Sequence, residues 1–196
     1  KTGMQSSRTF QFSTFPRTNI ASYINSVSEY EEILNNYIVT KSIDKPRQIW
    51  WKIRPHLEYN TVEFRVCDGQ RSIKRVETII SLIQSLVRTI LIDKTVLKRD
   101  YNYELLQDGL WKAAKYGLNC KIVDVGDNKV ISMVDMIKKM VNYCSGSLDY
   151  FGCKNVSSYV EQIISDGTES DLQVEVFNKG GLKKLNKYLM HEVDYK

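Results

Sequence analysis

The sequence predicts an α+β fold, in which a small antiparallel sheet is followed by a mainly helical half. Residues 48–68 contain two short runs in which apolar and charged side chains alternate. Residues 72–91 carry a wide apolar stripe at helical spacing, and most later segments also have helical spacing. We therefore expect a sheet-forming part at about residues 1–93 and a mainly helical part at about residues 94–196.

Each expected element rests on a local pattern. The first part should contain a strand at residues 9–15, one or two helices at 23–39, the two runs of residues 48–68 and a helix that Ser72 opens. The second part should contain helices at residues 103–116, 132–143, 156–165, 171–177 and from 182 onward, with a strand at 120–125. Gly117 should stop the first of these helices, and the glycines at 180 and 181 should separate the last two.

Residues 48–68, QIWWKIRPHLEYNTVEFRVCD, predict two strands around a six-residue turn. Side chains alternate between the two faces of a strand. One face would carry Trp50, Lys52, Arg54, Thr61, Glu63, Arg65 and Cys67, and the other Ile49, Trp51, Ile53, Val62, Phe64 and Val66. If the two runs form an antiparallel hairpin, only registers of one parity put both apolar rows on the same side. One such register pairs Lys52 with Glu63 and Arg54 with Thr61.

This charged face has two interpretations. It is either a solvated side of a sheet, where polar residues alternate outward, or a site for anionic substrates and a metal. The alternation alone favours the solvated side.

Composition excludes several classes of protein. The chain has 196 residues, 42% of them hydrophobic and 26% charged, with a net charge of +5, which is typical of a soluble globular protein. Dense basic runs and apolar segments of about 20 residues are missing, so we expect neither nucleic-acid binding nor a membrane span. Four cysteines without a CxxC pair and two isolated histidines predict free thiols in the cytoplasm and no zinc site. The start at Lys1 suggests a fragment or a processed chain.

Four sequence blocks resemble one family. WWKIRPHLEYNTVEFRVCD is similar to the WWDIRP…GTVEVRVCD segment of the carboxylate–amine ligases related to glutamate–cysteine ligase, in their bacterial and plant-like branch. SSRTFQFSTFPR, LWKAAKYGL and DGTESDLQ resemble three further blocks of that family, in the same order. The blocks extend over nearly the whole chain, and their order makes the resemblance specific.

The resemblance implies a glutamine-synthetase-like antiparallel sheet, of which this chain has only a part. It also implies ATP-dependent amide formation through an acyl phosphate, with glutamate or a similar carboxylate and an amine such as cysteine as substrates. By resemblance, Glu63 would bind Mg²⁺, Arg65 would act on the transferred phosphoryl group, and Arg17 and Arg54 would bind substrate carboxylate or phosphate. A homodimer is one assembly that the resemblance allows.

The chain also departs from the family pattern. Lys52 stands where the family has Asp, and the acidic strand motif of the family's N-terminal half has no counterpart here. Residues 1–196 are therefore expected to be the C-terminal portion of a single ligase catalytic domain, completed by a missing half or a partner chain. The alternative is a separate or degenerate half without catalysis that binds a nucleotide or a partner subunit.

Overall fold

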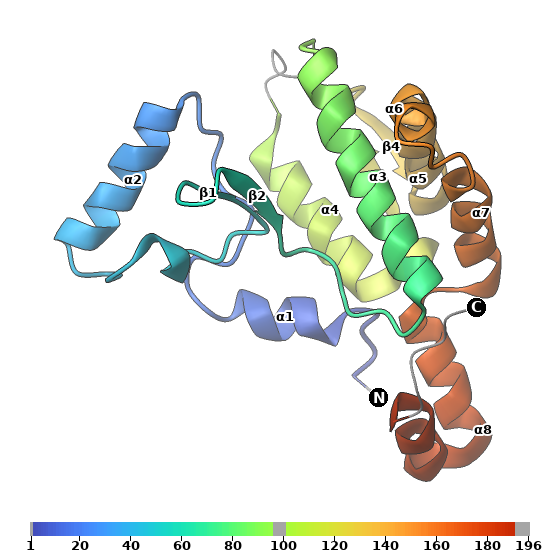
Figure 1. Cartoon of the computed structure of the whole chain (residues 1–196). Helices are drawn as coiled ribbons and strands as arrows, with labels where there is room; N and C mark the ends of the chain where they lie inside the picture. Colours follow the sequence, from blue (N-terminus) through green and yellow to red (C-terminus); the bar gives the residue numbers. More distant parts are fainter. Residues whose placement is uncertain (1, 96–100, 191–196) are drawn as a thin grey trace. The chain divides into compact units, whose positions relative to one another are not determined.

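Figure 1 shows the computed structural model of the chain, which describes residues 2–95 and 101–190. The fold combines helices, which make up 60% of it, with two small antiparallel sheets, as expected for the α+β class. The described residues form two compact units. We call Ser7–Asp68 the hairpin unit, and the remaining residues, 2–6, 69–95 and 101–190, the helical unit.

The hairpin unit contains three helical segments and one β-hairpin. Its elements are α1 (Ser7–Ser13), α2 (Val27–Val39), the 3-10 helix η1 (Pro46–Gln48), β1 (Ile53–His56) and β2 (Thr61–Phe64). Its core consists of Tyr30, Leu34, Ile43 and Ile49, with Trp51 packed against them.

The strand predicted at residues 9–15 is wrong, because this segment forms helix α1. Thr9 is buried, Phe12 and Ser13 are half-buried on the same side, and Gln11 is exposed, which is a helical periodicity. The hydroxyl of Ser13 donates to the carbonyl of Thr9 at 2.6 Å, one turn earlier. Because the apolar run is short, its sequence could not distinguish a strand from a helix.

One helix, α2, occupies most of the segment predicted as one or two helices. It begins later than expected, after Ser26, whose hydroxyl accepts a hydrogen bond from the backbone N–H of Glu29 at 3.1 Å. An N-cap of this kind satisfies one of the free donors at the start of a helix.

The predicted hairpin forms with the expected parity, but its register differs by two residues. Arg54 pairs with Glu63, and Ile53 pairs with Phe64. The turn has four residues, 57–60, instead of six, and its last residue, Asn60, has a φ of 51°. Since turn length sets hairpin register, the shorter turn shifts each pair by two positions.

The helical unit contains six helices, a 3-10 turn and a second hairpin within its described residues. They are α3 (Ile73–Ile92), α4 (Tyr103–Tyr116), η3 (Gly117–Asn119), β3 (Lys121–Asp124), β4 (Lys129–Ser132), α5 (Met133–Tyr143), α6 (Ser145–Tyr150), α7 (Val156–Asp166) and α8 (Glu169–Met190). In Figure 1, α3 lies beside α6 and α7. Leu82 and Leu86 of α3 pack against the buried core of this unit, which consists of Val141, Cys144, Leu148, Val156 and Val160.

Most boundaries predicted for this unit are confirmed. Ser72 and Ser132 cap α3 and α5, and α4 ends at Gly117, which has a φ of 57°. The backbone of α8 is not helical at Gly180 and Gly181, where the break was predicted. Strand β4 and helix α6 were not predicted. No helix within residues 2–95 and 101–190 has the length and apolar character to cross a bilayer.

Candidate active site

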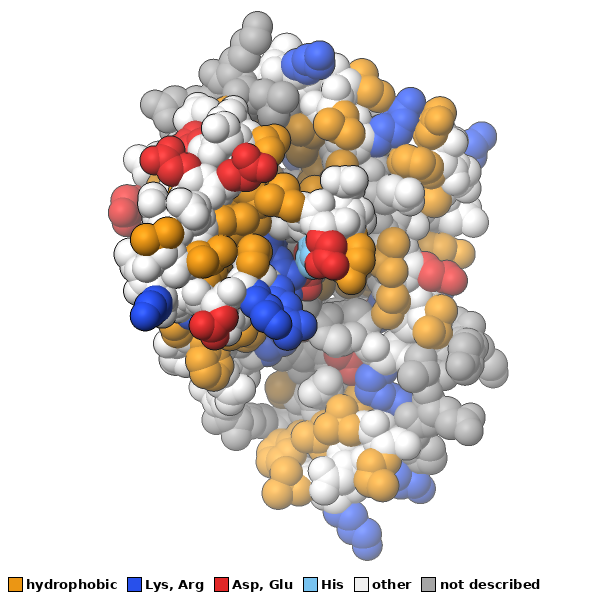
Figure 2. Space-filling view, turned by 60° about the vertical axis from the view of Figure 1, so that its left-hand side comes forward, with side chains coloured by type: hydrophobic (Ala, Val, Ile, Leu, Met, Phe, Trp, Pro, Cys, Tyr) orange, Lys and Arg blue, Asp and Glu red, His pale blue; other side chains and the backbone are white. Residues whose placement is uncertain are grey.

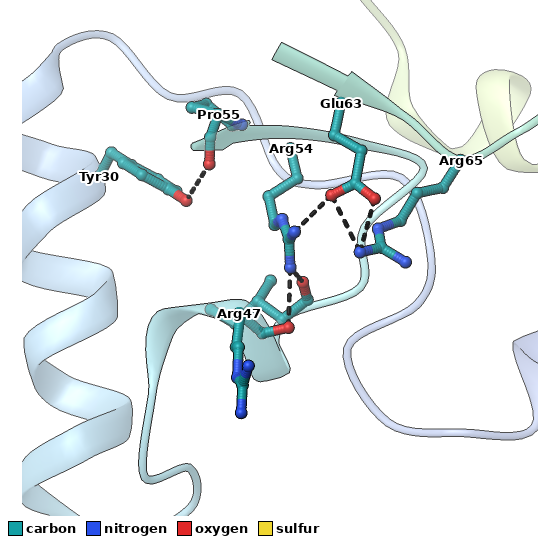
Figure 3. A network of polar contacts seen from close by, with 7 residues as sticks. Tyr30, Arg47, Arg54, Pro55, Glu63 and Arg65 are labelled. Atoms are coloured by element: carbon teal, nitrogen blue, oxygen red, sulfur yellow. Dashed lines mark hydrogen bonds and ion pairs between the residues drawn. The ribbon is translucent and has the colours of Figure 1, made fainter. Parts of the chain in front are cut away.

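Three of the four predicted site residues meet on one face of the first hairpin (Figure 3). A guanidinium nitrogen of Arg54 donates to Oε2 of Glu63. A guanidinium nitrogen of Arg65 lies 2.9 Å from the same oxygen and 2.7 Å from Oε1. We call Arg54, Glu63 and Arg65 the hairpin cluster. The register explains it, because Arg54 is directly opposite Glu63, and Arg65 follows two residues later on the same face.

Arg54 is fixed by the loop that precedes its strand. Its Nη1 donates to the carbonyl oxygens of Arg47 and Ile49, each at 2.8 Å. With Glu63 at its other end, the guanidinium contacts three acceptors, and Arg54 is only 5% exposed. Figure 3 shows that Arg47 takes part through its carbonyl, while its own side chain points away. Arg54 is therefore held rigidly, as a planar five-donor group can be.

The charged face of the hairpin is buried only in part, since the side chains of Glu63 and Arg65 are 37% and 23% exposed. Lys52 and Arg54, from the charged face, are 4% and 5% exposed, whereas Ile53 and Val62, from the apolar face, are 50% and 51% exposed. Buried charges are found in proteins where they are paired or where function requires them. This pattern favours the interpretation of the charged face as a site.

Arg17 does not belong to the hairpin cluster. It lies in the loop after α1 with a φ of 60°. Its Nε makes a long hydrogen bond of 3.5 Å to the carbonyl of Gln48, and its guanidinium carbon lies 6.0 Å from the centre of the Tyr37 ring. These contacts occupy Arg17 within the hairpin unit, so its role in substrate binding stays a prediction.

A pocket of about 460 Å³ opens beside Arg54 within the hairpin unit. Its lining comprises Tyr30, Lys45, Pro46, Arg47, Arg54, Pro55, His56, Leu57 and Glu58. Figure 2 shows basic and hydrophobic side chains gathered next to one another on this face of the molecule.

Sequence reasoning missed two residues of this pocket. The hydroxyl of Tyr30 donates to the carbonyl of Pro55 at 2.9 Å, which ties α2 to β1. Burial raises the pKa of Tyr30, while the charge of Arg54 lowers it in part. His56, at the end of β1, is half-buried and stacks on Tyr59 with ring centres 4.6 Å apart. The helical spacing of Tyr30 indicated only a core position.

The hairpin cluster alone does not form a metal centre. Both carboxylate oxygens of Glu63 accept hydrogen bonds or ion pairs from arginine. In the part of the chain that the structure describes, no three His, Cys, Asp or Glu side chains are grouped so that they could hold a metal ion. One carboxylate that is already paired does not supply the several oxygen ligands that Mg²⁺ needs.

The block DGTESDLQ forms a tight cap in the helical unit. The backbone N–H and the hydroxyl of Thr168 donate to Oδ2 of Asp171 at 2.8 and 2.7 Å, and Nε2 of Gln5 donates to Oδ1 of the same carboxylate at 3.0 Å. Gly167, at a φ of 89°, lies so close to Asp171 that a Cβ there would be 2.9 Å from the Asp171 Cβ. These contacts give the block a structural role at the start of α8.

Comparison with known proteins gives a consistent picture. Residues 1–186 match the model of glutamate-cysteine ligase family 2. A protein of Solibacter usitatus with the name "putative glutamate–cysteine ligase 2" is 33% identical over 198 residues, which cover 100% of this chain and 51% of that relative. Proteins of the same name from Herpetosiphon aurantiacus and Chloroflexus aggregans are 31% and 32% identical, over 92% and 97% of this chain and 48% and 50% of theirs. The chain thus spans about half the length of the curated relatives it matches.

Proposed function

Because the chain belongs to glutamate-cysteine ligase family 2, we propose that it supplies part of the active site of an ATP-dependent carboxylate–amine ligase. The observation that carries the proposal is the family match over residues 1–186, which includes the hairpin cluster. The substrates would be glutamate or a similar carboxylate, an amine such as cysteine, and ATP. The fold would be part of a glutamine-synthetase-like sheet in a single catalytic domain, and the protein would act in the cytoplasm.

The proposed reaction has two steps. An oxygen of the substrate carboxylate attacks the terminal phosphorus of ATP, so that an O–P bond forms and ADP leaves. The amine nitrogen then attacks the acyl carbon, a C–N bond forms, phosphate leaves with the C–O bond electrons, and the amine loses a proton. Negative charge gathers on the transferred phosphoryl group, so fixed cations next to it would lower the barrier.

Within the hairpin cluster, Arg65 is better suited than Arg54 to contact that phosphoryl group. Arg54 is committed to two backbone carbonyls and to Glu63. The side chain of Arg65 contacts Glu63 through one terminal nitrogen and is bound to no backbone carbonyl among the described residues, while the Nε atoms of Arg54 and Arg65 alike lack a hydrogen-bond partner there. We therefore assign Arg65 to the phosphoryl group and Arg54 to positioning Glu63. Arg17 would bind a substrate carboxylate or phosphate.

The hairpin cluster does not by itself fit Mg²⁺, so we derive no step through the metal. A bound Mg²⁺ would neutralise phosphate charge. Glu63 as one of its ligands is a proposal that requires further carboxylates from outside the described residues, together with an exchange of the arginine contacts for the metal.

The test is release of ADP and phosphate by the complete protein with ATP, Mg²⁺, glutamate and a panel of amines that includes cysteine. Glutamate-dependent turnover is expected, and its absence with every amine would contradict the proposal. Glu63→Gln should lower kcat at least about 100-fold. Glu32→Gln, on an exposed position of α2, is the matched control and should leave kcat unchanged. Far-UV circular dichroism of both variants should match the parent protein, and a near-normal rate for Glu63→Gln would remove Glu63 from the site.

One observation favours a second function. The hairpin cluster contains one carboxylate, Glu63, and no group of three or more ligand side chains exists among the described residues, while Lys52 replaces the Asp of the related motif. A non-catalytic half of a ligase would bind a nucleotide or a partner subunit through its cationic side chains and would not need carboxylates for a metal. Calorimetric binding of ADP without any turnover across the amine panel would support this alternative over the ligase.

A further inference from the structure

Lys52 lies directly across the hairpin from Arg65. The ladder pairs Ile53 with Phe64 and Arg54 with Glu63, so the next pair outward is Lys52 with Arg65. The backbone N–H of Arg65 donates to the carbonyl of Lys52 at 2.8 Å, which confirms that the two residues are neighbours. Opposite residues on one face have Cβ atoms roughly 5 Å apart, and two like charges in this arrangement repel each other.

Lys52 is a buried cation on the charged face of the hairpin. Only 4% of the residue is exposed, and its Nζ has no hydrogen-bond partner within the described part of the chain. The Phe12 ring, whose centre is 5.5 Å from Nζ, offers a weak cation–π contact. Burial of an ammonium group that makes no hydrogen bond is costly, so a lysine in this state is a candidate for ligand binding.

Charges around Lys52 do not compensate for its own. Glu63 is held by Arg54 and Arg65. Asp68 faces Arg8 at 3.7 Å, and Arg8 also donates to the carbonyl of Arg65 at 3.0 Å.

The pKa of Lys52 follows from these surroundings. Burial lowers the pKa most, and Arg8 lowers it further, whereas Asp68 raises it in part. Among the described residues of this region, the four cations Arg8, Lys52, Arg54 and Arg65 thus outnumber the two carboxylates, Glu63 and Asp68.

We infer that Lys52 and Arg65 together bind an oxyanion of a substrate, which is either a phosphoryl group or a carboxylate. An oxyanion between the two side chains would supply the acceptor that the ammonium lacks among the described residues, and it would add negative charge where cations outnumber carboxylates. Arg65 offers the second set of donors, since its Nε also has no partner among the described residues. The inference rests on the proposed ligase function and adds Lys52 to its site as a residue that selects anionic substrates.

Binding can be measured without catalysis. The complete protein would be labelled with ¹³C at lysine Cε, and the Lys52 resonance would be assigned by its loss in Lys52→Met. Inorganic phosphate would then be titrated in one experiment and glutamate in another. A saturable shift with phosphate alone would identify a phosphoryl site, and a shift with glutamate alone would identify a carboxylate site. If neither ligand moves the Lys52 resonance, the inference is overturned.

A matched pair of variants provides the second measurement. Lys52→Met keeps the length and the apolar stem but removes the charge, and Lys41→Met does the same at an exposed position of the hairpin unit. Lys52→Met should weaken binding of the active ligand at least about tenfold, while Lys41→Met should leave it unchanged. Equal affinity for the Lys52→Met and parent proteins would refute the inference.

The two proposals can fail separately. In a protein that turns over glutamate, a Lys52→Met variant with unchanged ligand affinity and unchanged KM for every substrate removes Lys52 from the site but leaves the ligase. In a protein that binds phosphate or glutamate through Lys52, absence of turnover with all amines refutes the ligase and leaves the binding site.

Discussion

Arg54 should be the most important single side chain for the stability of the hairpin unit. Arg54→Met removes the donors to the carbonyls of Arg47 and Ile49 and the ion pair with Glu63. An acceptor that loses its partner in a buried place costs about 1–3 kcal/mol. Loss of the ion pair adds at most about 1 kcal/mol, because the side chain of Glu63 is 37% exposed and stays paired with Arg65. Since these contributions overlap, we expect the free energy of unfolding to fall by about 4 kcal/mol.

The assay is urea unfolding followed by tryptophan fluorescence, which reports on the hairpin unit through Trp50 and Trp51. Arg47→Met is the matched control, because Arg47 contributes a carbonyl that the substitution retains. It should change the free energy of unfolding by no more than about 0.5 kcal/mol. Arg54→Lys should remain destabilising, since an ammonium cannot reach all three acceptors. A loss below about 1 kcal/mol for Arg54→Met would refute the reasoning.

Three further predictions concern other parts of the chain. Gly117→Ala should lower the free energy of unfolding by about 1–3 kcal/mol, measured by thermal unfolding, because Gly117 has a positive φ. Gly146→Ala, inside α6 with open space around it, is the control and should not destabilise the protein. Equal shifts of the melting temperature for the two variants would contradict this prediction. Lys52→Met should raise stability at neutral pH. Because the pKa of Lys52 is lowered in the folded state, the unfolded chain holds this proton more tightly, and the parent protein gains stability as pH rises from that pKa toward about 10.4. The stability advantage of Lys52→Met should therefore shrink in this pH window. A constant difference between the urea midpoints of the two proteins would refute this prediction. With a thiol reagent at pH 8, exposed Cys67 should react well before Cys144, which is fully buried. Burial raises the pKa of both thiols, so the difference comes from accessibility, and similar rates in mass spectrometry would contradict the prediction.

Local signals in the sequence were sufficient for most helices. Ser72, Ser132 and Gly117 mark helix ends through their own side chains or backbone, so nearby residues determine them. The segment of α1 lacks such a signal, and its helical state depends on which side of it is buried. The alternation of residues 52–65 predicted the parity of the hairpin, but the register depended on a turn whose length the sequence left open.

The candidate site was predictable in part. Alternation placed Arg54, Glu63 and Arg65 on one face, and the structure brings them into contact. Burial of that face could not be predicted, because charged residues are usually exposed and the apolar face is the expected interior. The acceptors of Arg54 are backbone carbonyls, which have no signature in the sequence.

The exposed apolar side of the first hairpin has a practical consequence for handling the protein. Ile53, Val62 and Val66 are 40% to 51% exposed on a ribbon in which β1 and β2 pair only with each other among the described strands. Isolated two-stranded ribbons are marginally stable in water, and exposed apolar strands favour association between chains. The chain should self-associate through this apolar side at high concentration, and Val62→Lys should improve its solubility.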